Sequence, residues 1–286
     1  MQLRVATRGE RQPPARGVDA PGVHVWRTAD GELIAYGYRE DATCWMHWPS
    51  VGAFRFDATD PCITAFVEPG VSRPLVDDVY RRSVLPMARQ ALGDEALHAS
   101  GVLTSRGVVA FAGRSHAGKS TFAYALSRRG FAQWADDGVV IRVSGGAVHA
   151  VPLAFQVRLR PESSRLFGEH ARALRQFDPP VSIPPSTGGT PLAAICLLER
   201  LDAATATLVE QMDPARAFTS VLVHAHEFNP HDDARRRRML EAYLELVAVV
   251  PVFTVQFPSG AEHMDDVFAC VTRALNVAPV PAPAAI

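Results

Sequence analysis

Short apolar runs separated by turn residues dominate the first part of the chain. The turn signals include Asp30-Gly31, and the runs are rich in β-branched and aromatic residues, a pattern typical of antiparallel strands. The runs lie at Val23–Arg27, Leu33–Tyr38, Cys44–Trp48, Phe54–Phe56 and Ile63–Val67. We therefore expect a small, mostly antiparallel sheet with an aromatic core, which is a better account of these aromatic residues than a base-stacking platform. Residues 1–21 show no periodicity, which predicts a loose lead-in.

The spacing of the apolar residues changes after these strands. From Pro74 to Leu92 the apolar residues recur every three or four positions, which predicts an amphipathic helix with a kink or break at Pro86 and an end at Gly93. Beyond it we expect strands at Ala96–Leu103, Val108–Ala112, Phe131–Ala135, Val139–Val143, Ala147–Val151, Pro191–Leu198, Ala203–Val209 and Val252–Gln256. We expect helices after residue 119 and at Pro214–His224, Arg235–Val249 and Met264–Leu275. The fold class is therefore α/β, with a β-rich region at 1–92, a main domain at 93–276 and a disordered tail at 277–286.

Residues 107–126 join a strand, a glycine loop and the start of a helix. They match the P-loop pattern G-x-x-x-x-G-K-[ST], in which backbone N–H groups and a helix N-terminus surround a phosphate. In this pattern the lysine reaches the β- and γ-phosphates and the serine hydroxyl binds Mg²⁺. We therefore expect ATP and Mg²⁺ as cofactors, bound by Gly113, Ser115, His116, Ala117, Gly118, Lys119, Ser120 and Thr121.

Lys119 stands out by composition as well as by position. The chain has 29 Lys and Arg residues, and Lys119 is the one lysine among them. A chain that otherwise uses arginine keeps the compact ammonium where a point charge must fit between phosphates. This choice favours a phosphate-binding loop with a catalytic Lys119 over a glycine turn that only joins a strand to a helix.

A second chemical signal is the pair Asp136-Asp137, directly after the strand that follows the P-loop helix. In α/β sheets, ligands gather at the carboxyl ends of strands, so we expect Asp136 to act as the general base and Asp137 to bind the metal with Ser120. His98 lies in the strand whose hairpin leads into the P-loop strand, and it is either a catalytic residue near the nucleotide or a packed core histidine.

Other candidates are weaker. Arg158 and Arg160 alternate on an expected strand, so both face one side, where they suit either a phosphate or an acceptor carboxylate, or serve structure alone. The Pro- and Gly-rich segment 178–191 is a candidate mobile loop over the substrate. We interpret His224-Ala-His226 as a helix-end or surface pair rather than a metal site, and Arg235–Arg238 as mostly solvated.

Charge and composition exclude several classes of partner. The net charge of −1 argues against nucleic acid and against an anionic membrane surface. The four cysteines form no C-x-x-C pair, so we expect reduced thiols. Neither a signal peptide nor a long apolar run is visible, which predicts a cytoplasmic protein. The oligomeric state is left open, a homo-oligomer included.

Three motifs together carry a family resemblance: LHASGV at 97–102, GRSHAGKS at 113–120 and ADD at 135–137. They resemble the kinase domain of the HPr kinase/phosphorylase family, whose nucleotide-binding core is similar to that of the phosphoenolpyruvate carboxykinases. The resemblance implies a P-loop kinase core of that type behind a small N-terminal β-rich subdomain. It also implies that His98 lies near the transferred phosphate and that Asp136 and Asp137 supply base and metal contacts.

The chain also departs from that family. Thr121 and Gly138 replace a glutamate and an arginine, and the R-G-[LIVM]-G stretch is missing, which argues against phosphorylase activity and against HPr as the substrate. Divergent relatives with these motifs resemble kinases of ribosomal peptides, including lasso-peptide precursors phosphorylated on a C-terminal serine. We therefore expect an ATP-dependent kinase that acts on a serine of a peptide or protein. The alternatives are a small-molecule kinase and a nucleotide-binding regulatory module without catalysis.

Overall fold

The structure is a computed structural model that describes residues 1–7, 9–10, 12–28, 30–157, 159, 161–167, 175–177, 189–228 and 232–280. The described residues form a mixed α/β fold with two large sheets, in agreement with the expected fold class. The chain divides into two compact units. Met1–Gly93 and Glu227–Arg238 form the first unit, and Asp94–His226 and Met239–Ile286 form the second.

The first unit contains a sheet of six described strands in the order β1-β6-β5-β4-β3-β2. Strands β2 to β6 form the expected antiparallel meander, and β1 pairs in parallel with β6. The bounds are β1 Gln2–Val5, β2 Val23–Arg27, β3 Leu33–Glu40, β4 Thr43–Trp48, β5 Gly52–Phe56 and β6 Cys62–Val67. We expected residues 1–21 to be loose, and this is wrong for Gln2–Val5, which form β1. The sequence gives no sign of this strand because its partner, β6, lies far along the chain. The buried rings of Tyr38, Trp45 and Phe54 confirm the aromatic core.

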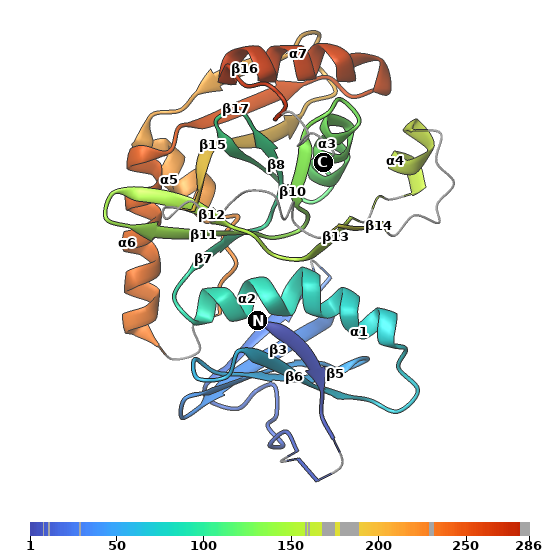
Figure 1. The fold of residues 1–286 in the computed structure, drawn as a ribbon, viewed down its shortest axis with the longest axis vertical. Helices are drawn as coiled ribbons and strands as arrows, with labels where there is room; N and C mark the ends of the chain where they lie inside the picture. Colours follow the sequence, from blue (N-terminus) through green and yellow to red (C-terminus); the bar gives the residue numbers. More distant parts are fainter. Residues whose placement is uncertain are drawn as a thin grey trace, which may run out of the picture. The chain divides into compact units, whose positions relative to one another are not determined.

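One helical segment lies along a face of this sheet (Figure 1). It consists of α1 (Arg73–Val79), a π turn (Tyr80–Val84) and α2 (Leu85–Ala91). Pro86 lies in the first turn of α2, and Leu85 N–H donates to the carbonyl of Tyr80, five residues back. Since proline has no N–H, the wider π turn accommodates the missing donor, and the helix continues instead of breaking at Pro86.

The segment 227–238 contributes buried groups to the first unit. Phe228 is buried against Gly37, where any Cβ would lie 2.6 Å from its ring. The guanidinium of Arg235 is buried and donates from Nε and Nη2 to the carbonyl of Gln90, at 2.9 and 2.6 Å. The prediction of solvated arginines is confirmed for residues 236–238, which are exposed, and wrong for Arg235.

The second unit contains a sheet of nine described strands. The order is β10-β8-β9-β15-β12-β11-β7, and β17 and then β16 continue the sheet from β15. Strands β9 and β17 both run parallel to β15, whereas β8 runs antiparallel to β9 and to β10. The bounds are β7 Glu95–Leu97, β8 Ala99–Thr104, β9 Gly107–Ala112, β10 Ala132–Ala135, β11 Val139–Ser144, β12 Ala147–Val151, β15 Thr190–Arg200, β16 Leu208–Gln211 and β17 Val252–Phe257.

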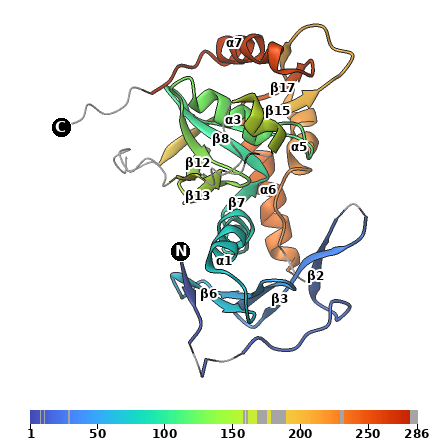
Figure 2. The same cartoon turned by 90° about the vertical axis from the view of Figure 1, so that its right-hand side faces the viewer.

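Helices cover both faces of this sheet (Figures 1 and 2). Phe122 of α3 (Lys119–Ser127) and Phe268 of α7 (Met264–Leu275) pack together over one face. Val221 of α5 (Pro214–Leu222) and Tyr243 of α6 (Asp233–Val249) are buried against the other face. The remaining elements are α4 Pro161–Leu166, a 3-10 turn at Ala261–His263 and a two-stranded ribbon of β13 Phe155–Val157 and β14 Arg175–Phe177.

Two further segments differ from expectation. The strand predicted at Ala203–Val209 begins only at Leu208, because the preceding residues form turns. The first residues of the tail that was expected to be disordered from residue 277 are bound to the second unit. Ser105 N–H donates to the carbonyl of Ala278 at 2.9 Å, and Pro279 forms a β-bridge with Thr104. Residues 281–286 lie outside the described residues.

The described cysteines, which are all four of the chain, are free thiols, as expected. Among the helices of the described chain, none combines the length and apolar content needed to cross a lipid bilayer.

Candidate active site

Three segments of the second unit meet at one edge of its sheet. Strands β9 and β10 both run antiparallel to β8, so they share a direction and end at the same edge. Residues 113–118, which we call the glycine loop, follow β9, and Asp136 and Asp137 follow β10. Because β8 runs the opposite way, His98, which immediately precedes it, lies at this edge too. This arrangement brings together the two chemical signals of the sequence.

The glycine loop needs its special residues. Gly113 has φ +154°, and a Cβ there would lie 2.8 Å from the carbonyl oxygen of Leu198, so a side chain does not fit. His116 and Gly118 have φ of 69° and 93°, and these left-handed residues turn the chain into α3. Gly118 is the N-cap of α3 and offers no side chain to its first N–H groups. The helix start is therefore suited to an anion.

The Lys119 side chain lies against the glycine loop. It is 9% exposed, and its Nζ donates to the carbonyl oxygens of Gly113 at 3.1 Å and Arg114 at 3.4 Å. The ammonium is thus held where a phosphate in the loop would meet it. This position agrees with the expected role of Lys119 in binding the β- and γ-phosphates, which we call its clamp role. The role itself stays a prediction.

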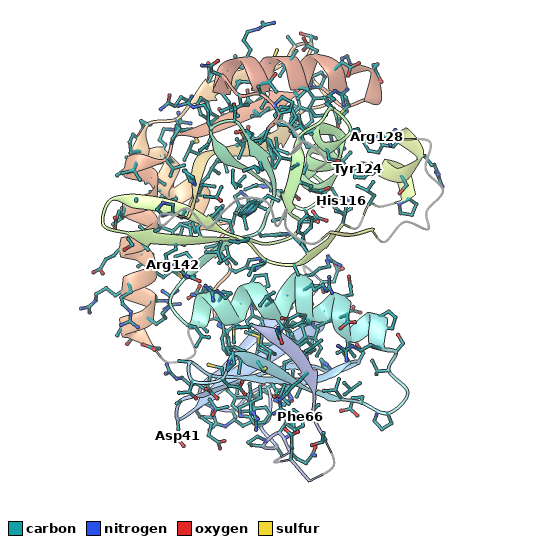
Figure 3. All side chains as sticks on the ribbon, viewed as in Figure 1. Asp41, Phe66, His116, Tyr124, Arg128 and Arg142 are labelled. Carbon is teal, nitrogen blue, oxygen red and sulfur yellow. The ribbon has the colours of Figure 1, made fainter. Side chains whose placement is uncertain are left out.

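The other predicted loop residues differ in exposure. Ser115 and His116 are exposed, and Ala117 is buried. Figure 3 shows His116 near the start of α3, with Tyr124 within that helix and Arg128 at its C-cap. Ser120 and Thr121 are partly buried, and the Thr121 hydroxyl is hydrogen-bonded to that of Ser163 at 2.7 Å.

Asp136 is held in a buried position. It is 4% exposed, and the buried hydroxyl of Ser100 in β8 donates to its Oδ1 at 2.7 Å. This hydrogen bond fixes the orientation of the carboxylate across two neighbouring strands. Sequence reasoning gave Ser100 no role, although it stands in the same short motif as His98.

Asp137 is contacted by two histidines. Its backbone has φ 68°, unusual for a residue other than glycine, and its Oδ1 lies 3.1 Å from Nε2 of His98. Nε2 of His226 lies 3.3 Å from the carbonyl oxygen of Asp137, and the two imidazole rings are 5.8 Å apart. The side chain of one histidine therefore holds the carboxylate, and that of the other holds the backbone.

A short stretch of strand pairing brings the second histidine to this edge. His98 N–H donates to the carbonyl of His224, and His226 N–H donates to that of Ala96, both at 2.7 Å. This pairing interrupts the strand predicted at Ala96–Leu103, which breaks at His98 into β7 and β8. The prediction that His224 and His226 form a helix-end or surface pair is wrong for His226, which is partly buried at the site. Their sequence signal was the His-Ala-His spacing itself.

The electrostatics of the site favour the neutral forms of His224 and His226. Burial, and secondly the charge of His98, lower the pKa of His226 from 6.5 to about 4. Burial also lowers the pKa of His224, with smaller contributions from Lys119, His98 and Arg114.

A pocket adjoins the glycine loop. Its volume is about 800 Å³, and it is lined mainly by residues 113–117, the end of β15 and one side of α5. It extends to His224, which bonds to the backbone of His98. Arg158, Arg160 and residues 178–188, all predicted to contact or cover a substrate, lie outside the described residues.

No protein-family model and no curated protein matches the chain. Among solved structures, the chain is similar to the Hpr(Ser) kinase/phosphatase from Coxiella burnetii, with 12% sequence identity and a TM-score of 0.34. The match covers 63% of this chain and 97% of that chain. At this level it indicates a distant structural relation only, and the functional case rests on the residues of the site.

Proposed function

We propose that the second unit binds ATP with Mg²⁺ and transfers the γ-phosphate to the hydroxyl of a serine in a peptide or protein. One observation carries the proposal: Asp136 and Asp137 follow a strand that ends at the same sheet edge as the glycine loop, and His98 contacts Asp137 at 3.1 Å. A module that only binds nucleotide needs the loop and the lysine. Transfer of a phosphate to a hydroxyl needs, besides the loop and the lysine, carboxylates that are oriented beside the loop.

The donor set fits Mg²⁺. Ser120 and Asp137 offer hard oxygen ligands, and the described residues contain no group of three or more His, Cys, Asp or Glu side chains that could hold a metal by themselves. Mg²⁺ in kinases is bound by one or two carboxylates together with substrate phosphates and water, so a two-residue protein contribution is sufficient. When bound, Mg²⁺ would neutralise charge on the phosphates.

The chemical step assigns a role to each residue. The hydroxyl oxygen of the acceptor serine in the substrate forms a bond to the γ-phosphorus of ATP. At the same time the bond from that phosphorus to the β–γ bridging oxygen breaks, and ADP leaves. The serine proton passes to the carboxylate of Asp136, which Ser100 holds in place. Lys119 neutralises charge on the phosphate that moves. His98 acts through Asp137, whose carboxylate it orients.

Mass spectrometry of serine-containing peptides after incubation with ATP and Mg²⁺ tests the proposal. We expect a mass increase of one phosphate that localises to serine, that disappears when serine is replaced by alanine, and that Lys119→Ala abolishes. Transfer to small hydroxyl compounds but to no peptide would favour the small-molecule kinase. Binding of ATP without transfer to any hydroxyl would favour the binding module.

A further inference from the structure

The pocket beside the glycine loop reaches a residue that is hydrogen-bonded to the backbone of the candidate active site. Its wall includes His224, whose carbonyl accepts the N–H of His98 at 2.7 Å, and His98 in turn contacts Asp137 at 3.1 Å. The loop contributes residues 113–117 to the wall, whereas residues 118–121, where α3 begins, do not line the pocket. The pocket thus adjoins the glycine loop and, through His224, the backbone of His98, which makes it a candidate place for the acceptor of the phosphate.

Positive charge dominates this pocket. Among the described residues, arginines from three different elements line it: Arg114 of the glycine loop, Arg200 at the end of β15 and Arg216 of α5. All three are exposed, and within the described chain no ion pair involves them. The carboxylate in the wall, Glu199, accepts a hydrogen bond from Gln256 at 2.9 Å.

The net charge of the whole chain does not explain this local excess. That net charge is −1, so a cluster of arginines that have no carboxylate partner among the described residues is a local feature of this site. The fork-shaped guanidinium group binds carboxylates through paired hydrogen bonds. Apolar side chains, among them Leu201, Met212 and Val223, complete the wall and can contact the carbon atoms of a ligand. A volume of about 800 Å³ is enough for a short peptide segment.

We propose that this pocket binds the acceptor and selects acidic peptides, with Arg200 and Arg216 pairing with carboxylates next to the serine that receives the phosphate. The inference rests on the proposed function and specifies its substrate class. Arg114 adds to the positive field, but its place in the glycine loop makes it a poor test residue because it also adjoins the phosphates.

Two labelled serine peptides test the inference, one with glutamates and one with glutamines on both sides of the serine. Fluorescence anisotropy measures their binding without requiring transfer. We expect the glutamate peptide to bind at least about tenfold more tightly at low salt, and this preference to shrink as salt screens the charges. Arg200→Gln and Arg216→Gln should each weaken binding of the glutamate peptide by about tenfold and leave ATP affinity unchanged.

Arg273→Gln is the matched control, because Arg273 is an exposed arginine on α7, outside the pocket wall. It should change neither affinity. Equal binding of the two peptides, or loss of ATP affinity instead of peptide affinity in Arg200→Gln and Arg216→Gln, overturns the inference even if the protein is a kinase. Arginine-dependent binding of the glutamate peptide without any transfer supports the pocket assignment and contradicts the kinase proposal.

Discussion

At the scale of single residues, the site depends on a few polar contacts whose loss has separable effects. Lys119 is an example, since its Nζ bonds to the carbonyl oxygens of Gly113 and Arg114. The ammonium thus stabilises the loop in the absence of phosphate and is positioned to bind phosphate when it arrives. This double role calls for a small point charge.

Lys119→Arg should therefore lower the rate of phosphate transfer by at least ~10²-fold, because a planar guanidinium is larger and cannot enter the loop in the same way. Single-turnover assays at saturating ATP measure this rate. Circular dichroism should show an unchanged fold. A variant with near wild-type turnover would refute the clamp role of Lys119.

His226 is predicted to act as a positioning residue through Asp137. Its Nε2 lies 3.3 Å from the Asp137 carbonyl and holds that residue in a left-handed conformation, with φ 68°. His226→Leu removes the donor and should lower kcat by about tenfold with little change in the KM for ATP. His226→Gln keeps an N–H near the same place and should recover most of the rate.

The thermal midpoint separates this role from a packing role. If His226→Gln and His226→Leu lose activity equally, and only in proportion to their loss of stability, then His226 serves packing and not the geometry of Asp137.

At the scale of elements, local sequence signals predicted the strand, loop and helix around Lys119 correctly. The glycines, the apolar run of β9 and the helical pattern of α3 are all contained within residues 107–126. Strands β11 and β12 were predicted for the same reason, because each is a short apolar run and the glycine-rich turn Ser144-Gly145-Gly146 separates the two runs. These elements depend on neighbours in sequence, so a single sequence contains enough information to find them.

The missed features all depend on partners far apart in sequence. The break of the strand at His98 comes from pairing with residues 224–226, and β1 forms only because β6 is beside it. Arg235 is buried because the carbonyl of Gln90 accepts its hydrogen bonds. Hydrophobic periodicity contains no information about such pairings. The same reason explains why His226 and Ser100 were not named as site residues.

The glycine loop gives a prediction at this scale. Gly113→Ala should lower the free energy of unfolding by ~2 kcal/mol or more and also weaken ATP binding, because φ is +154° and the new Cβ would lie 2.8 Å from the Leu198 carbonyl oxygen. Chemical denaturation and ATP titration measure the two effects.

Gly145→Ala is the control for this prediction. Gly145 also has a positive φ, +60°, but nothing lies within 4 Å of a Cβ added there. It should cause a smaller loss of stability and no loss of ATP affinity. Equal effects of the two variants would mean that the close approach to Leu198 is unimportant.

At the scale of the whole molecule, each unit contains a histidine that destabilises the fold in acid. Burial lowers the pKa of His47 in the first unit and of His226 in the second from 6.5 to about 4. Between these values the unfolded chain binds protons that the folded chain does not. The free energy of unfolding therefore falls as pH is lowered from 6.5 towards 4.

His47→Gln should remove part of this pH dependence. Urea unfolding followed by tryptophan fluorescence reports mainly on the first unit, because Trp26, Trp45 and Trp48 lie there and Trp134 lies in the second. As pH falls from 6.5 towards 4, the free energy of unfolding of the wild type should fall more steeply than that of His47→Gln. A difference between the two proteins that does not change with pH would contradict the burial-lowered pKa of His47.

The central claim is that the sheet edge around the glycine loop transfers phosphate, with Asp136 as the proton acceptor. Its most direct test is the single-turnover rate of transfer from ATP to a serine peptide in Asp136→Asn, measured alongside ATP affinity, with Asp137→Asn compared over a range of Mg²⁺ concentrations. Asparagine keeps the size of the side chain and removes its basicity. We predict unchanged ATP affinity and a rate lower by about 10²- to 10⁴-fold in Asp136→Asn, and a higher Mg²⁺ requirement in Asp137→Asn. A near wild-type transfer rate in Asp136→Asn would contradict the account.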